Sequence, residues 1–332
     1  MSDRSLLSPW IRRFLLEHLV GERNLSLNTQ ASYRDTLTLL LPFVSQHGGH
    51  VIDRMAVEDL SPTMVRKFLE HLEHDRHCCG TTRNLRLSAI HSLARYIGMH
   101  SPVHLSWCTE VRAIAFKKTT KTLIGYLEKE EMDALLKQPD RRTLRGERDH
   151  ALLLFLYNSG ARADEAASLT VSNLQLGSSP AVRILGKGNK LRLCPLWPAT
   201  VAVLTRFVTE REGHDHVFLG RTQEPMTRFG VHRVVTQYAE RAGQGVPSMM
   251  TKRITPHTIR HTTAVHLLRA GVDINTIRAW LGHASLDTTN IYAEVDLEMK
   301  AKALASVDIS GLPAFSGPPK ALPSLMAFLK GL

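Results

Sequence analysis

Several side chains in the C-terminal part of the chain can bind a phosphate or move a proton. The stretch "LGHASLDTTNIYAEV" carries His283 and, nine residues later, Tyr292. Upstream, "ITPHTIRHTTAVHLL" places His257 and Arg260 three residues apart, which is the spacing of one face of a helix. A tyrosine by itself is usually a packing residue. The significance of Tyr292 therefore depends on the groups that accompany it.

Two further cationic residues belong with this set. Arg162 follows a glycine in "SGARADE", and Lys187 lies at the turn "GKGNK". Two arginines can bind the non-bridging oxygens of a phosphate and offset the charge that develops in a five-coordinate transition state. A phenol that attacks phosphorus needs a proton acceptor and the departing alkoxide needs a proton donor, and histidine and lysine can fill these roles. The set has no carboxylate pair and no metal-ligand pattern, so it fits a metal-free phosphoryl transfer through a phosphotyrosine.

The N-terminal part of the chain predicts helices and no convincing strand. Ser61, which precedes a proline, predicts one helix start. Asn28 or Thr29 is predicted to cap an earlier helix. These patterns indicate a small all-α domain over residues 1–116. The polar and basic "KKTTKT" of residues 117–122 indicates an interdomain linker.

A second domain is expected over residues 123–310, mainly α with a small β-hairpin. Thr255 is predicted to cap one helix and Asp273 the next, which Gly282 ends. The hydrophobic period changes around "GKGNK", where glycine and asparagine supply the turn of a hairpin. The alternating residues of that hairpin are Val182, Ile184, Leu191 and Leu193.

The composition indicates a soluble globular protein with a polyanionic partner. The chain has 332 residues, of which 43% are hydrophobic and 22% charged, and its net charge of +11 is shared by both domains. A basic protein without such a partner is the alternative. Four cysteines without CxxC spacing fit a reducing cytoplasm. The sequence shows no signal peptide and no apolar run long enough for a bilayer, so we expect a cytoplasmic protein without a membrane partner.

Five motifs together resemble those of the tyrosine recombinase (phage integrase) family, in the style of the Xer-like integrases. They are "SGARADE", "GKGNK", "HTIRHTTAVHLL", "LGHAS" and "TTNIY", all in the order that the family requires. The resemblance covers roughly residues 126–295. More weakly, residues 1–116 resemble the family's core-binding, SAM-like domain. A C-shaped two-domain clamp around DNA is the architecture that this resemblance and the charge imply.

The resemblance implies a role for each reacting residue. Tyr292 would attack the scissile phosphate and leave a 3′-phosphotyrosyl link with a free 5′ hydroxyl. His257 would help to take the proton from the tyrosine, and Lys187 would protonate the leaving oxygen, with Lys190 as the alternative donor. The phosphate itself would be bound by the remaining residues, Arg162, Arg260 and His283.

The expected partner is double-stranded DNA that carries specific recombination sites. Family members act as tetramers on DNA, so the resemblance also implies a homo-oligomer, with or without a second related recombinase. We expect residues 311–332 to form a hinge and a C-terminal helix exchanged between subunits; the alternative is a helix that folds back on its own domain. The candidate DNA-contacting residues are Arg83, Arg86, Lys117, Lys118 and Lys121.

Other functions remain as alternatives. A topoisomerase-like enzyme would use the same chemistry to nick and close supercoiled DNA, and an accessory protein would bind DNA without cutting it. Phage integration, transposition, cassette exchange and chromosome resolution all fit the chemistry. No cofactor is expected, and a zinc site is the less favoured interpretation of a cluster that lacks the usual ligand spacing. That cluster comprises His71, His74, His77, Cys78 and Cys79.

Overall fold

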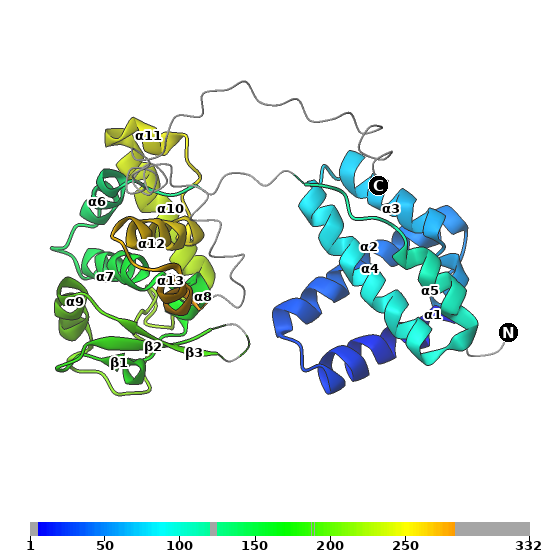
Figure 1. The fold of residues 1–332 in the computed structure, drawn as a ribbon, viewed down its shortest axis with the longest axis horizontal. Coiled ribbons are helices and arrows are strands. Elements are labelled where there is room, and N and C mark those ends of the chain that lie inside the picture. The colour runs from blue at the N-terminus through cyan, green and yellow to red at the C-terminus, as the bar shows by residue number, and fades with distance from the viewer. Residues whose placement is uncertain (1–5, 120–124, 187, 189, 283–332) are drawn as a thin grey trace, which may run out of the picture. The chain divides into compact units, whose positions relative to one another are not determined.

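A computed structural model describes residues 6–119, 125–186, 188 and 190–282 of the chain. The chain divides into two units, residues 1–122 and 123–332, and each is described by itself (Figure 1). Four of the candidate residues lie outside the described residues: Lys121, Lys187, His283 and Tyr292.

The N-terminal unit is built mainly of helices. A π-helical segment, Phe14–Glu22, continues the first α-helix, and short 3₁₀ turns occur at Ile52–Arg54, Val57–Asp59 and Pro102–His104. One apolar core runs through the unit. The α-helices are α1 (Leu7–Arg13), α2 (Leu27–Gly48), α3 (Pro62–His74), α4 (Gly80–His100) and α5 (Leu105–Arg112).

Serine side chains begin two of these helices. The Ser61 hydroxyl accepts a hydrogen bond from the backbone N–H of Met64 at 3.2 Å, which confirms the predicted start of α3. The predicted cap of α2 at Asn28 or Thr29 is wrong. Ser26 fills that role, because its hydroxyl accepts from the N–H of Thr29 at 3.4 Å and the helix begins at Leu27.

The C-terminal unit combines helices with a small sheet. Strands β1 (Leu174–Gln175), β2 (Ala181–Leu185) and β3 (Leu191–Pro195) are antiparallel and lie in this order. A 3₁₀ turn at Val171–Asn173 precedes β1. The helices are α6 (Lys129–Lys137), α7 (Leu144–Ser159), α8 (Ala163–Ala167), α9 (Pro198–Val208), α10 (Arg228–Gly245), α11 (Pro247–Met250), α12 (Pro256–Arg269) and α13 (Ile274–Leu281).

The predicted hairpin is present, but on its second strand the buried residues are not the leucines that the alternation suggested. Leu185 pairs with Leu191 at the closed end, and Ile184 pairs with Arg192 across the strands. Partners in a pair share a face, so Arg192 is buried with Ile184. The apolar residues of β3 point to the outer face instead: Leu191 and Leu193 are 64% and 58% exposed.

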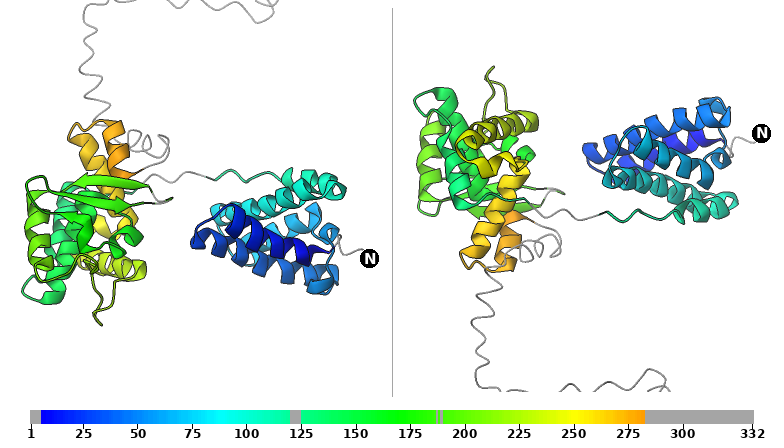
Figure 2. Two further views of the ribbon diagram at one scale, coloured as in Figure 1. Left: turned by 90° about the horizontal axis from the view of Figure 1, so that it is seen from below. Right: turned by 90° about the horizontal axis from the view of Figure 1, so that it is seen from above.

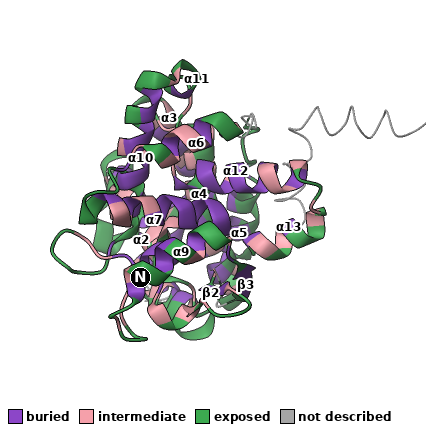
Figure 3. Ribbon diagram, turned by 90° about the vertical axis from the view of Figure 1, so that its left-hand side faces the viewer, coloured by how far each residue is buried: buried purple, intermediate pink, exposed green. Residues whose placement is uncertain are grey.

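The helices of the C-terminal unit gather around α7 and α12. The Thr263 hydroxyl on α12 donates to the Tyr157 carbonyl of α7 at 2.7 Å, and α12 is buried along most of its length (Figure 3). Its predicted cap, Thr255, accepts from the N–H of Thr258 at 3.3 Å. None of the helices in the described part of the chain is long and apolar enough to cross a membrane.

Helix α13 brings the chain back beside the hairpin. Its predicted cap is confirmed, because one Asp273 carboxylate oxygen accepts from the N–H groups of Asn275 and Thr276 at 2.9 and 3.1 Å. Gly282 ends the helix with φ +67°, a conformation that favours glycine. The helix lies next to β3 (Figure 2). His283, which follows Gly282 in the sequence, lies outside the described residues.

Candidate active site

Arg162 stands at the start of α8, immediately after the tight turn that ends α7. Gly160 makes this turn with φ +58°, and a Cβ there would approach Leu281 Cδ2 to 2.4 Å. Arg162 Nη1 donates to Glu165 Oε1 at 2.7 Å, and the Arg162 backbone N–H donates to Oε2 at 2.8 Å. The Arg162 side chain is 36% exposed whereas that of Glu165 is only 6% exposed. The guanidinium therefore reaches the surface while its partner is inside.

Arg192 holds the same carboxylate from the other side. Its Nη1 and Nη2 donate to Glu165 Oε1 and Oε2 at 3.0 and 2.7 Å, a bidentate pair. Its Nε donates to the Trp280 carbonyl at 2.9 Å, at the end of α13. Burial would raise the pKa of Glu165, but the hydrogen bonds and charge of Arg192, together with the Arg162 contacts, lower it to about 2. Glu165 is thus a buried carboxylate shared by two arginines.

Among the candidate residues that the structure describes, Arg260 is the most deeply buried. Only 1% of its surface is exposed. Its Nη1 donates to the Gly160 carbonyl and its Nη2 to the Leu281 carbonyl, both at 2.7 Å. These carbonyls belong to the turn before Arg162 and to the end of α13. Arg260 therefore ties together the two segments that precede Arg162 and His283 in the sequence.

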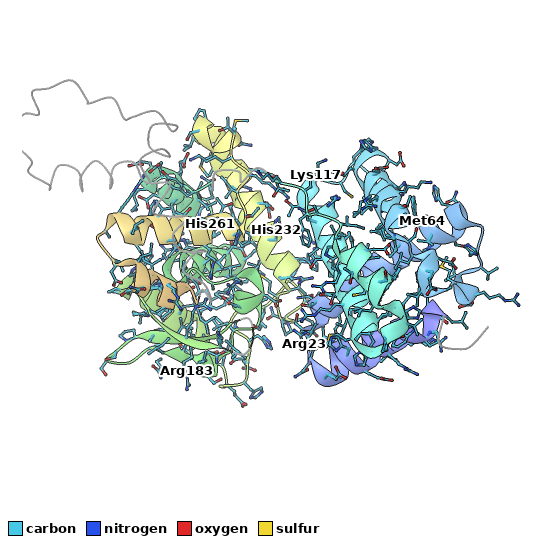
Figure 4. All side chains as sticks on the ribbon, turned by 45° about the vertical axis from the view of Figure 1, so that its right-hand side comes forward. Arg23, Met64, Lys117, Arg183, His232 and His261 are labelled. Carbon is cyan, nitrogen blue, oxygen red and sulfur yellow. The ribbon has the colours of Figure 1, made fainter. Side chains whose placement is uncertain are left out.

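His257 lies one turn before Arg260 on α12. Its ring meets that of His261 edge to face, with the ring centroids 4.2 Å apart (Figure 4 labels His261). His257 is exposed at the surface, but desolvation of its ring by neighbouring residues lowers its pKa, and the positive charges of Arg260 and Arg162 lower it further. The neutral imidazole, which can accept a proton, is therefore the form favoured near pH 7.

The structure brings Arg162, His257 and Arg260 into one region, and it describes Lys190 beside the hairpin turn. Lys190 is exposed, and its carbonyl accepts from the N–H of Gly186 at 2.8 Å. The positions of Lys187, His283 and Tyr292 lie outside the described residues. Their roles remain predictions.

The candidate DNA-contacting arginines of the N-terminal unit make contacts within their own unit. Arg83 Nη1 donates to the Ala115 carbonyl at 3.2 Å. Arg86 Nη1 donates to the Thr36 hydroxyl at 3.0 Å and so joins α4 to α2. Both side chains are half-buried. Each therefore holds its own domain together, and contact with DNA stays a prediction for both.

The lysines near the end of this unit are more exposed. Lys117 Nζ donates to Glu73 at 2.7 Å, and its backbone N–H donates to the Asn84 side chain at 3.0 Å (Figure 4). These contacts attach Lys117, predicted as the first linker residue, to the N-terminal unit. Lys118 is exposed.

In the cluster considered for zinc, the His71 ring pairs with Asp75 at 2.7 Å.

Two functional candidates, Glu165 and Arg192, were missed by the sequence reasoning. Glu165 falls in "SGARADE", three residues after Arg162, at the spacing that lets a helix side chain reach back to the residue at its start. Arg192 stands between two leucines on a strand with alternating faces. The alternation of that strand favours its leucines for the buried face, so no local signal marks Arg192 as buried.

The chain is similar to known proteins in both of its units. Residues 125–299 match the phage integrase family, and residues 11–98 match the phage integrase N-terminal SAM-like domain. A putative integrase/recombinase of Sinorhizobium fredii, y4rC, is 37% identical over 335 residues, which cover the whole of both chains. The tyrosine recombinase XerD of Chlorobaculum tepidum is 33% identical over 301 residues, 87% of this chain and 93% of that protein.

A solved structure shares the fold. It is the XerH site-specific recombinase bound to a palindromic difH substrate, with a TM-score of 0.67, 22% identity, and coverage of 86% of this chain and 81% of that one. The sequence matches define the class: the chain belongs to the phage integrase family of tyrosine recombinases, which are DNA strand-transferring enzymes.

The low pKa of Glu165 predicts a pH-dependent stability. The folded pKa of about 2 lies below the ordinary 4.5, so the carboxylate stabilises the fold above about pH 4.5 and this stabilisation is lost as the pH falls toward 2. Between these limits we expect the wild type to lose on the order of 3 kcal/mol more free energy of unfolding than Glu165→Gln. Guanidinium unfolding at several pH values measures the difference.

The neighbouring exposed carboxylate supplies the control. Asp164→Asn should follow the wild type at every pH, because Asp164 lies at the surface of the same helix. Equal acid sensitivity in the wild type and in Glu165→Gln would contradict the assignment of a buried, ionised Glu165.

Proposed function

We propose that this chain is a site-specific DNA recombinase that cuts and rejoins strands through a 3′-phosphotyrosyl link to Tyr292, without metal or ATP. The observation that carries the proposal is the convergence of two arginines on one turn. Arg260 donates to the carbonyl of Gly160, and Arg162 follows two residues later. Both arginines lower the pKa of the nearby His257. The positive charge of the arginines can offset the charge of a phosphate, and the neutral imidazole of His257 can accept the proton of an attacking phenol.

The reaction balances without a further reagent. The Tyr292 oxygen forms a bond to phosphorus as the bond to the 5′ oxygen breaks. The phenol proton passes to His257, and Lys187 supplies a proton to the 5′ oxygen. Arg162, Arg260 and His283 offset the charge on the non-bridging oxygens. Because a phosphodiester replaces a phosphodiester, a 5′ hydroxyl of another strand can reverse the step with little change in free energy.

The remaining tyrosines of the chain support the choice of nucleophile. Burial raises the pKa of Tyr157 to about 12, and its hydroxyl contacts His266 at 2.7 Å. The buried Tyr238 hydroxyl donates to Asp149 at 3.0 Å. The other described tyrosines contact neighbouring aromatic or arginine side chains: Tyr33, Tyr96 and Tyr126. These contacts give each of the five a structural role, which is consistent with the assignment of Tyr292 from its motif "TTNIY".

The protein is further proposed to bind duplex DNA with both units and to act as a tetramer. The net charge of +11 favours binding to the phosphate backbone. Arg83 and Arg86 would add to this attraction through their charge, and the exposed lysines through direct phosphate contacts. Residues 312–332 are proposed to dock on a neighbouring subunit, and assembly with a second recombinase fits the same scheme.

Covalent linkage to DNA tests the proposed chemistry. Wild type and Tyr292→Phe are incubated, in excess chelator, with nicked duplexes from the DNA that flanks the gene. The wild type should form a protein–DNA adduct that survives detergent and disappears with protease. Tyr292→Phe should shift the same DNA in a gel but form no adduct, because only the nucleophilic oxygen is removed.

Each alternative gives a distinct result. An adduct that chelation abolishes would overturn the metal-free mechanism. Binding by both proteins without any adduct would favour an accessory DNA-binding protein. Relaxation of supercoiled DNA that lacks any paired site would favour a topoisomerase-like enzyme.

Deletion of residues 312–332 tests the proposed subunit exchange. The truncated protein should bind a single half-site nearly as the full chain does, because the two basic units are retained. Its multimeric complexes on DNA should be lost, as measured by analytical ultracentrifugation with labelled duplex. Equal loss of half-site binding and assembly would contradict exchange and favour a helix that stabilises its own domain.

A further inference from the structure

Arg192 contacts described residues in three separate segments of the candidate site. Its guanidinium forms a bidentate pair with Glu165 of α8 and a hydrogen bond with the carbonyl of Trp280 in α13. Two glycines lie against the same side chain. A Cβ on Gly186 would lie 3.3 Å from Arg192 Nη1, and a Cβ on Gly282 would lie 3.0 Å from Arg192 Cδ.

These contacts stand next to the proposed reacting residues in the sequence. Glu165 holds Arg162, Gly186 immediately precedes Lys187, and Gly282 immediately precedes His283. The Arg192 side chain is itself 6% exposed and comes from the buried face of β3. One buried guanidinium therefore contacts α8, the hairpin and the end of α13, each next in sequence to a proposed reacting residue.

Besides these contacts, Arg192 changes the net charge around Arg162. Glu165 carries one negative charge and lies between two positive guanidinium groups, so Arg162, Glu165 and Arg192 together have a net charge of +1. Without Arg192, the Arg162–Glu165 pair would be neutral, and Arg162 would bind an anionic phosphate less well. The Glu165 carboxylate would also lose two of its donors while remaining buried.

We propose that Arg192 is a positioning residue for strand cleavage: it neutralises Glu165, so that the charge of Arg162 remains available to the scissile phosphate. The inference rests on the proposed function of Arg162 and adds a residue that does not itself touch the DNA. A merely structural arginine would stabilise the fold without any dependence of the reaction on the charge of Glu165. The two roles therefore differ in how Arg192 and Glu165 are coupled.

A double-mutant cycle on the full chain measures this coupling. The variants are Arg192→Met, Glu165→Gln and the combination of both, and the readout is the rate of adduct formation on the nicked duplex at saturating protein. Arg192→Met should slow the reaction roughly 10- to 100-fold, as misplacement of a binding group does. The double variant should be faster than Arg192→Met by roughly fivefold or more, because no uncompensated carboxylate remains beside Arg162.

Two further variants serve as controls: one separates the charge of Arg192 from its geometry, and the other removes an arginine outside the site. Arg192→Lys keeps the charge but loses the bidentate geometry, so it should retain more activity than Arg192→Met. Arg183→Met removes an exposed arginine from the paired strand, where Arg183 Nη2 donates to the Ser172 carbonyl at 2.8 Å, and should leave the rate unchanged (Figure 4). Thermal unfolding confirms that every variant is folded at the assay temperature.

The outcomes separate this inference from the proposed function. A wild type that forms no adduct overturns both. A wild type that forms the adduct, with a double variant no faster than Arg192→Met, leaves the proposed function standing and overturns the positioning role. Recovery of rate in the double variant, measured at a temperature at which all the variants are fully folded, supports it.

Discussion

The C-terminal unit depends on buried charged groups that are hydrogen-bonded within the unit. Glu165, Arg192 and Arg260 lie inside the unit, where an isolated charge would cost several kcal/mol to desolvate. The carboxylate receives donors from two arginines, and each buried arginine donates to a carbonyl near the end of α13. The groups and their partners come from several segments, so the charges are satisfied only when α8, β3, α12 and α13 are together.

This constraint explains how short, separate segments can form one site. Arg260 reaches the turn before Arg162, and Arg192 reaches the glycines that precede Lys187 and His283 in the sequence. Loops by themselves would hold such groups loosely, and a misplacement of about 1 Å can cost 10²-fold in rate. A buried hydrogen-bonded network supplies the rigid support that the proposed phosphoryl transfer requires.

Local signals made much of the fold predictable. Helix caps such as Thr255 and Asp273 depend on neighbouring backbone groups, and the change of hydrophobic period located the hairpin. The inner face of β3 was not predictable by the same means, because alternation shows two faces but not which one is buried. Arg192 is inside only because its partner Glu165, 27 residues earlier, is brought to it by the tertiary fold. The candidate side chains could thus be named from motifs, and Glu165 from its spacing to Arg162, whereas the burial of Arg192 could not be predicted.

The proposed reaction attaches the DNA to one particular phenol, that of Tyr292. Wild-type adduct can be digested with nuclease and trypsin and the peptides sequenced by mass spectrometry. We expect a nucleotide attached through its 3′ phosphate to Tyr292 and to no other of the six tyrosines. A nucleotide on another side chain, or one attached through its 5′ phosphate, would contradict it.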